Sequence, residues 1–197
     1  MKSVVLETPD GIDVRLGWDP SMSEHDRKRV LAKELVAAKL KLDPKDVRVE
    51  REAPAQFGFH TQLFASVEGK ELPLQIRNAS FRAATVVALT DQPYTIGLDI
   101  RDLHPDEATI HEMQRHSRLF DESNILNLID HWTRVQAVRE ADGRGARVVP
   151  DVVKLDATRQ RGWVPDRRAQ YTILDLSRDG FVVTLAFADA EDARTPV

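Results

Sequence analysis

The chain has 197 residues, with 28 basic and 32 acidic side chains, 42% hydrophobic residues and no cysteine. A chain of this length buries roughly 70% of its unfolded surface, which is enough for one globular domain or for two small lobes that share a core. The absence of cysteine excludes disulfides, thiol catalysis and cysteine-ligated zinc. It also fits a reducing compartment, so we expect a cytoplasmic protein.

Two classes of partner are not expected. No apolar run approaches the ~20 residues that cross a bilayer, and the first 20 residues carry four acids where a signal peptide is apolar. The net charge of −4 gives no general attraction to phosphate backbones. We therefore expect neither a membrane nor a nucleic acid as a partner.

The N-terminal segment predicts a hairpin and then a helix. Apolar alternation over residues 3–6 and 12–16, on either side of a Pro-Asp-Gly turn at 9–11, is typical of a β-hairpin. Ser23 caps a stretch in which leucine and alanine recur at helical spacing. Asp43-Pro44 ends this pattern, which predicts a first helix of about five turns.

Strands are expected in the middle of the chain. Residues 47–76 mix strand and loop signals, with short extended pieces around 57–64 and 72–76. The runs 85–89 and 95–100 are apolar and rich in β-formers, and an Asp-Gln-Pro turn separates them. We expect these two runs to form a pair of central strands.

Two helices follow the central strands. Pro105 stands where the first helical turn tolerates proline, and Ile110, Met113 and Leu119 give the apolar face of the first helix. An apolar stripe over residues 125–135 sets the register of a longer helix, and Gly143-Arg-Gly145 ends it.

The C-terminal third predicts three more strands. Residues 148–153, 170–176 and 181–187 alternate between apolar and polar, and Ser177-Arg-Asp-Gly180 reads as a hairpin turn. The tail from Asp189 is charged, and we expect it to fray. The predicted fold class is therefore α+β.

Three segments together resemble one enzyme family. They are Ile96-Gly-Leu-Asp-Ile100, the stretch from Trp132-Thr-Arg-Val-Gln136 to Gly143-Arg-Gly145, and Asn78-Ala-Ser-Phe-Arg82. Their order and spacing resemble the 4′-phosphopantetheinyl transferases of the surfactin type. The resemblance runs from about Ser23 to Ala188.

The resemblance implies a fold, a reaction and a partner. The fold is a pseudo-twofold pair of α+β lobes, here residues 1–91 and 92–197, with the site in the cleft between them. The reaction transfers phosphopantetheine from coenzyme A to a serine of an acyl or peptidyl carrier protein, as a holo-acyl-carrier-protein synthase does. Mg²⁺ held by carboxylates offsets the charge on the diphosphate. A monomer is expected, because one chain holds both lobes.

The charged positions of the family are mostly replaced here. The first metal-binding aspartate falls on Asp99, whereas the second acidic ligand falls on Arg101. The helix glutamate, a metal ligand and proton acceptor, falls on Gln136, the lysine before it on Val135 and the later lysine on Glu140. An amide has no charge and accepts no proton at neutral pH.

The coenzyme A contacts of the family are also altered. The phosphate-contacting histidine falls on Phe81, beside Arg82. The basic turn upstream has two candidates, Gly69-Lys70-Glu71 with Lys70 as the contact, and His60-Thr-Gln-Leu63. Arginines at 82, 101, 134, 139 and 144 could lend positive charge to a diphosphate.

These replacements predict a transferase-like protein whose activity is lost or much weakened, in other words a pseudoenzyme that keeps the fold. Two alternatives remain open at this point. One is a non-catalytic module that binds a carrier protein or another partner, and the other is a site reused for a different anionic ligand.

Three other sets of residues have ordinary interpretations. Trp132 lies in an apolar stripe and is expected in the core. The spacing of His104, His111, His116 and His131 does not match a helical zinc pair, so solvent-facing histidines are expected. The arginines at 159, 161, 167 and 168 lie beside Asp156 and Asp166, which predicts solvated loops in place of an anion site.

Overall fold

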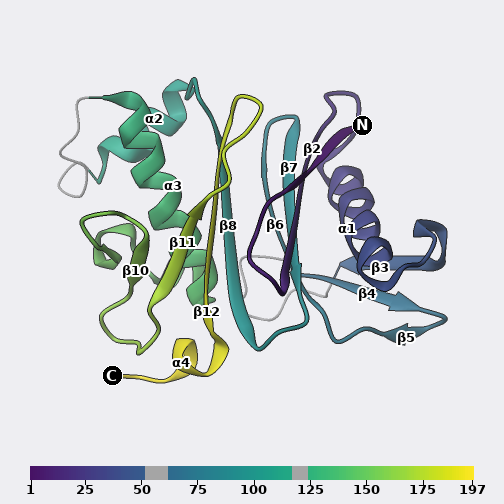
Figure 1. Cartoon of the computed structure of the whole chain (residues 1–197). Helices are drawn as coiled ribbons and strands as arrows, with labels where there is room; N and C mark the ends of the chain where they lie inside the picture. The colour runs from purple at the N-terminus through teal and green to yellow at the C-terminus, as the bar shows by residue number, and fades with distance from the viewer. Residues whose placement is uncertain (52–61, 117–123) are drawn as a thin grey trace. The chain divides into compact units, whose positions relative to one another are not determined.

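The computed structural model describes residues 1–51, 62–116 and 124–197 (Figure 1). The chain divides into two compact units, Met1–Gln92 and Pro93–Val197. Each unit has an antiparallel sheet with a helix packed on one face, so the fold is mixed α+β. None of the described helices is long and apolar enough to cross a membrane.

The first unit contains a sheet of seven strands among the described residues. Their order is β1-β2-β7-β6-β4-β3, with β5 paired to β4. The strands are β1 (Lys2–Leu6), β2 (Ile12–Trp18), β3 (Val47–Arg51), β4 (Leu63–Val67), β5 (Lys70–Glu71), β6 (Gln75–Phe81) and β7 (Ala84–Thr90). The predicted hairpin is confirmed, because β1 pairs with β2 in antiparallel register.

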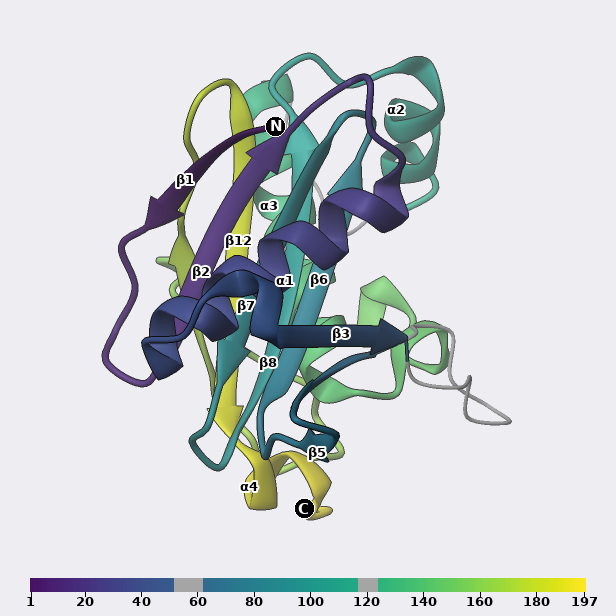
Figure 2. The same ribbon diagram turned by 90° about the vertical axis from the view of Figure 1, so that its right-hand side faces the viewer.

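Helix α1 (Glu24–Leu40) covers the first sheet, and Figure 2 shows it lying across the strands. The Ser23 side chain accepts a hydrogen bond from the Asp26 amide, as the cap pattern predicts. Leu31, Leu35 and Val36 point into a buried cluster with residues of β3, β4, β6 and β7. The predicted first helix is therefore confirmed in its start, its apolar face and its end before Asp43-Pro44.

The second unit has a sheet with the order β8-β12-β11-β10-β9 in the described part of the chain. The strands are β8 (Tyr94–Asp102), β9 (Lys154–Leu155), β10 (Arg161–Trp163), β11 (Tyr171–Asp175) and β12 (Phe181–Asp189). The strands predicted over 170–176 and 181–187 are confirmed, and they pair across the Ser177–Gly180 turn.

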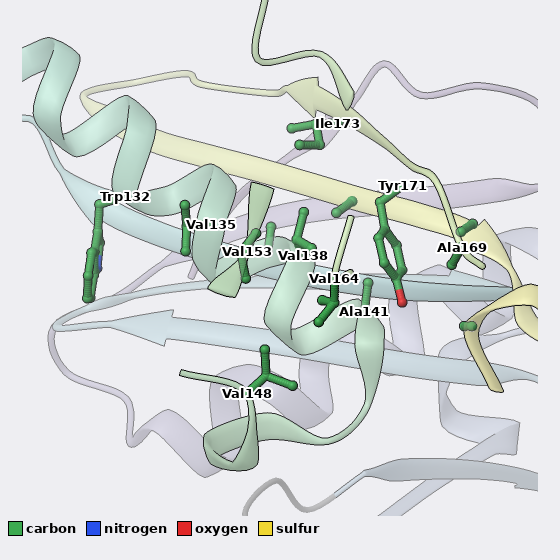
Figure 3. Close-up of a cluster of buried hydrophobic side chains, with 14 of the residues drawn as sticks. Trp132, Val135, Val138, Ala141, Val148, Val153, Val164, Ala169, Tyr171 and Ile173 are labelled. Carbon is green, nitrogen blue, oxygen red and sulfur yellow. The ribbon is translucent and has the colours of Figure 1, made fainter. Parts of the chain in front are cut away.

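The helices of the second unit are α2 (Glu107–Gln114), α3 (Ile125–Asp142) and α4 (Ala190–Arg194). Helix α3 packs on β8, β12 and β11, and Gly143 ends it with a left-handed φ of 81° that glycine adopts without strain. Trp132 has no exposed surface and joins Val135, Val138 and Tyr171 in the core, as Figure 3 shows. The core position predicted for Trp132 is thus confirmed.

The two units share one connectivity. In each, a strand leads into a helix and four further strands follow, and the last of these returns to pair with the first. The resulting orders, β2-β7-β6-β4-β3 and β8-β12-β11-β10-β9, correspond strand for strand. Strands β1 and β5 in the first unit and helix α2 in the second are additions to this common pattern.

The predicted pairing of residues 85–89 with 95–100 is wrong. Both runs are strands, β7 and β8, but they belong to different sheets. Strand β7 is already paired on both sides, with β2 and β6, so it has no edge left for β8. The Asp-Gln-Pro segment therefore links two sheets and does not close a hairpin.

Five smaller predictions are also corrected or lie outside the described residues. The strand predicted over 148–153 is a 3₁₀ turn at Pro150–Val152, where proline lacks the amide that a sheet needs. The tail forms α4, capped by Asp189. Helix α2 begins after its cap Asp106, so Pro105 precedes the first turn. Leu119 and residues 57–61 of the extended piece predicted over 57–64 fall outside the described residues.

Candidate functional site

Strand β8 packs one face against helix α3, and Gly97 on that face lets the two backbones come close together. A Cβ atom on Gly97 would lie 2.2 Å from the Ala137 carbonyl oxygen and 2.2 Å from the Ala141 amide nitrogen. No side chain fits in that space. Because side chains alternate along a strand, Asp99 and Arg101 lie on the same face as Gly97.

A hydrogen bond between β12 and α3 shows which residue of the helix lies near Asp99. Asp99 is directly opposite Thr184 on β12, and the Thr184 hydroxyl donates to the Thr133 hydroxyl on α3 over 3.0 Å. Directly opposed residues in an antiparallel pair share a face. Asp99 therefore faces α3 beside Thr133, and Gln136 follows Thr133 one turn along the helix.

The Asp99 carboxyl is buried and has a perturbed acidity. It is 8% exposed, and Oδ2 has no hydrogen-bond partner among the described residues. Burial raises the pKa of Asp99 to about 7, and Glu140 and Glu112 add to this rise, while the Arg101 guanidinium opposes it. A carboxyl with this pKa exchanges its proton near neutral pH.

The partner of Asp99 is a cation from the same strand. Arg101 Nη2 lies 3.4 Å from Asp99 Oδ1, and its side chain is 19% exposed. Arg101 Nη1 also donates to the carbonyl oxygen of Ile100 over 3.2 Å. The positive charge next to Asp99 is therefore the Arg101 guanidinium of the same strand.

A second guanidinium holds the amide on α3. Arg139 Nη1 donates to Gln136 Oε1 over 2.7 Å, and Arg139 Nε donates to the Val148 carbonyl oxygen over 2.5 Å. Gln136 is 8% exposed, and its Nε2 has no partner among the described residues. Burial lowers the pKa of Arg139, while Glu140, Glu112 and Asp99 oppose the fall. The Gln136 side chain thus has a buried Nε2 donor without a hydrogen-bond partner among the described residues.

The other residues suggested by the resemblance lie in two different settings. Val135 is fully buried in the core cluster on α3, so its side chain packs against apolar neighbours. Glu140 lies on α3, close enough to Asp99 and Arg139 to act on their pKa values. Glu112 on α2 acts on the same two groups, and the sequence did not single it out. No local signal identifies Glu112, because only the packing of α2 brings it near β8.

Phe81, Arg82 and Lys70 belong to the first unit. Phe81 and Arg82 form the tight turn between β6 and β7, where Arg82 has a φ of 53° and its guanidinium carbon lies 5.2 Å from the Phe81 ring centre. The buried Arg27 on α1 donates to the Arg82 carbonyl oxygen over 2.7 Å. Lys70 is exposed on β5. The alternative turn at 60–63 lies partly outside the described residues.

Two of the arginines expected to lend charge already have acidic partners. Arg134 Nε donates to both carboxylate oxygens of Asp130. Arg144 bridges Asp142 and Asp166 with four hydrogen bonds. Arg101 and Arg139 are therefore the arginines that contact Asp99 and Gln136.

The histidines differ from the expected solvent-facing set. His104 and His111 are exposed, whereas His116 and His131 are half-buried. His116 Nδ1 lies 2.8 Å from Asp151 Oδ1, and its ring lies 5.6 Å from the Trp132 ring. The expectation of solvent-facing side chains thus holds for two of the four.

The donor set around Asp99 does not fit Mg²⁺. A hard divalent cation requires ionised carboxylates and other oxygens at about 2.0–2.1 Å. Asp99 is half protonated near neutral pH, its neighbour is a guanidinium, and the Gln136 oxygen already accepts from Arg139. In residues 1–51, 62–116 and 124–197, no three His, Asp or Glu side chains gather into a group that could hold a metal ion.

Comparisons with known proteins add no relative. A scan against protein-family models gives no match for this chain, and a search of curated proteins gives no similar sequence.

Proposed function

We propose that this chain is a 4′-phosphopantetheinyl transferase-like protein that has lost, or greatly weakened, the transfer reaction. The observation that carries the proposal is the ion pair of Asp99 with Arg101 on the face of β8 that packs on α3, the helix that carries Gln136 one turn from Thr133. These residues come from the two segments with the strongest family resemblance, and the resemblance aligns them with acidic groups of the family.

The repeated connectivity supports the architecture in this proposal. A pseudo-twofold pair of α+β lobes requires two units with the same strand order and helix insertion. The orders β2-β7-β6-β4-β3 and β8-β12-β11-β10-β9 meet that requirement. The proposed lobes are thus residues 1–91 and 92–197.

The chemistry of the site argues for weak or absent transfer. Removing a general base typically costs 10² to 10⁴ in rate, and removing a charge that stabilises a phosphoryl centre costs about 10² to 10³. The amide of Gln136 accepts no proton, and its oxygen is engaged by Arg139. Asp99 titrates near neutral pH, but the Arg101 guanidinium occupies one side of it. Coenzyme A and a carrier protein would then be bound without efficient turnover.

A labelling assay tests this proposal. The purified full chain is incubated with Mg²⁺, fluorescent coenzyme A and several apo carrier proteins, and an active phosphopantetheinyl transferase serves as the reference. We expect labelling at least about 10²-fold slower than the reference. Labelling at a comparable rate that disappears in Asp99→Ala would show that the site is catalytic and would overturn the proposal.

A second candidate is a protein that uses the same residues to hold another anionic ligand. Arg101 and Arg139 favour it, because both guanidinium groups contact the site and neither needs a metal to attract an anion. Thermal-shift measurements separate the two. Stabilisation by coenzyme A supports the transferase-like proposal, whereas stabilisation by simple phosphates alone favours the second candidate.

A further inference from the structure

Strand β3 is the last strand of the first sheet in the described part of the chain, and helix α1 lies beside it (Figure 2). A pocket of about 250 Å³ lies between the two elements. The residues that line it are Asp26, Arg29, Val30 and Lys33 of α1 and Arg48, Val49 and Glu50 of β3. An exposed sheet edge is a place where proteins accept an additional strand from a partner.

The pairing of β4 shows which backbone groups of β3 point outward. Leu72, beside β5, donates its amide to the Ala65 carbonyl oxygen over 2.8 Å, so the backbone groups of Ala65 point away from β3. Val49 is directly opposite Ala65. In an antiparallel pair, directly opposed residues exchange both hydrogen bonds or neither. The amide and the carbonyl of Val49 therefore point away from β4, and so do those of Val47 and Arg51, two residues before and after it.

Two of these outward groups are already bonded. Val47 donates its amide to the Pro44 carbonyl oxygen, and Arg29 Nε donates to the Val49 carbonyl oxygen over 3.1 Å. The Val47 carbonyl and the amides of Val49 and Arg51 have no partner among the described residues. An antiparallel partner opposite Val47 or Val49 needs both groups of that residue, whereas a parallel partner residue bonds the carbonyl of one and the amide of the other. The remaining groups therefore fit a parallel strand.

The side chains along this edge carry a net positive charge. Arg29, Lys33 and Arg48 make no ion pair within the part of the chain that the structure describes. Asp26 and Glu50 are the two acids on the pocket wall, so three cations and two acids leave a formal charge of +1. The whole chain has a net charge of −4. This edge is therefore more basic than the chain to which it belongs.

A parallel strand at this edge presents alternate side chains to helix α1. A partner residue that bonds to Val47 and Val49 is level with Arg48 and shares its face, whereas the residues before and after it share the face of Val49. Val47 and Val49 point into the cluster that α1 covers. Those neighbouring residues therefore lie beside Arg29 and Lys33, where acidic side chains are favoured.

We propose that the edge of β3 beside α1 binds an extended acidic segment of a partner protein, which adds to the first sheet as a parallel strand. Backbone hydrogen bonds to Val47, Val49 and Arg51 supply the affinity, and Arg29 and Lys33 select acidic side chains. The proposal is independent of the proposed function, because it uses none of the residues of the Asp99 site.

Three peptides test the proposal on the full chain. The probe is a capped hexapeptide in which valine alternates with glutamate. The second peptide has lysine in place of glutamate, and the third keeps the glutamates but has N-methylated valines, which cannot donate to the Val47 carbonyl. Amide shifts and hydrogen exchange are followed by NMR at constant ionic strength. We expect the probe alone to give saturable shifts over residues 47–51 and to slow exchange of the Val49 and Arg51 amides by about tenfold or more.

Two variants complete the test. Lys33→Glu reverses one charge on the helix wall and keeps the β3 edge, and we expect it to weaken binding of the probe by about fivefold. Lys154→Glu, the same change at an exposed lysine on β9 of the second unit, is the matched control and should leave the affinity unchanged.

Four results would overturn the proposal. They are absence of binding by the probe, equal binding of the three peptides, unchanged affinity in Lys33→Glu, and a Val49 amide that is already protected without peptide. Sedimentation of the free chain assigns that last result to a second copy if the chain is a dimer, or to the chain's own segments if it is a monomer.

Discussion

At the scale of single residues, the state of Asp99 depends on two opposing effects. Arg101 at 3.4 Å offers roughly 4 to 5 kcal/mol of attraction at an effective dielectric constant of about 20. The pKa nevertheless rises from 3.8 to about 7, so the loss of hydration outweighs the cation. The ionised form of Asp99 therefore destabilises the folded protein relative to the protonated form.

The pH dependence of stability follows from this raised pKa. Between about pH 4 and pH 7 the unfolded chain releases the Asp99 proton while the folded chain keeps it, so this group makes stability fall as pH rises. Asp99→Asn removes the effect. We expect its free energy of unfolding, relative to the wild type, to increase by about 2 to 3 kcal/mol between pH 5 and pH 8. Urea unfolding at both pH values measures it.

Asp166→Asn is the control with the opposite sign. The hydrogen bonds from Arg144 lower the pKa of the exposed Asp166, so its contribution is present above the unfolded value and is lost only in more acidic solution. The difference between Asp166→Asn and the wild type should stay constant from pH 5 to pH 8. A constant difference for Asp99→Asn as well would contradict a raised Asp99 pKa.

At the residue scale, the sequence places side chains well only where chain position alone decides where they lie. The resemblance named Asp99, Arg101 and Gln136, and the structure places Asp99 and Arg101 on the face of β8 that packs on α3, the helix that carries Gln136. The sequence did not identify Glu112, because its proximity to Asp99 and Arg139 depends on how α2 packs. The solvent exposure predicted for Arg161 is confirmed, although Arg161 begins strand β10 and does not lie in a loop.

At the scale of elements, the contact between β8 and α3 depends on Gly97. The equivalent contact in the first unit involves Gly17, where a Cβ would meet the Leu31 side chain at 2.8 Å. Both glycines lie on the strand that precedes the helix of their unit, but they face different neighbours. One meets helix backbone, and the other meets the end of a flexible side chain.

Replacement of each glycine by alanine separates these cases. Gly97→Ala must push α3 away from β8, and we expect a loss of about 3 kcal/mol or more in the free energy of unfolding. Gly17→Ala requires only a shift of Leu31, and a loss of about 1 kcal/mol is expected. Chemical denaturation measures both. Similar losses of unfolding free energy in the two variants would show that α3 moves away from Gly97 at little cost.

Elements with strong local signals were predictable, and those defined by distant partners were not. Helix α1 has a cap, an apolar stripe and a stop within one stretch of chain, and all three were found. The pairing of β7 was not, because β2 and β6 take both of its edges and neither choice is encoded in β7 itself. The short strands β9 and β10 carry too few residues to show alternation.

At the scale of the whole molecule, the repeated connectivity gives each unit a core that does not depend on Arg101 or Gln136. Each unit has its own helix-covered core, represented by the clusters around Leu35 and Trp132. Arg101 and Gln136, which the proposed function treats as replacements, lie outside these clusters. Val135, where the resemblance places a lysine, is the exception, because it is fully buried in the core.

Reversal of the replacements tests this separation of fold and chemistry. Arg101→Glu with Gln136→Glu gives three carboxylates on β8 and α3, and we expect Mn²⁺ binding, measured by electron paramagnetic resonance, at least about tenfold tighter than in the wild type. Transfer should remain slow, because Phe81 and Glu140 are unchanged. Adding Phe81→His and Glu140→Lys should raise carrier-protein labelling by about 10²-fold or more.

Val135→Lys is left out of the reversal, since it would place a charge in the core and unfold the second unit. Asp99→Ala in the fully reversed chain is the control, and it should abolish both metal binding and labelling. If the reversed chain binds Mn²⁺ but never labels a carrier protein, the family resemblance fails, although the site can hold a metal. If Mn²⁺ binding does not improve, Asp99, Arg101 and Gln136 do not converge, and the proposed function loses the geometry on which it depends.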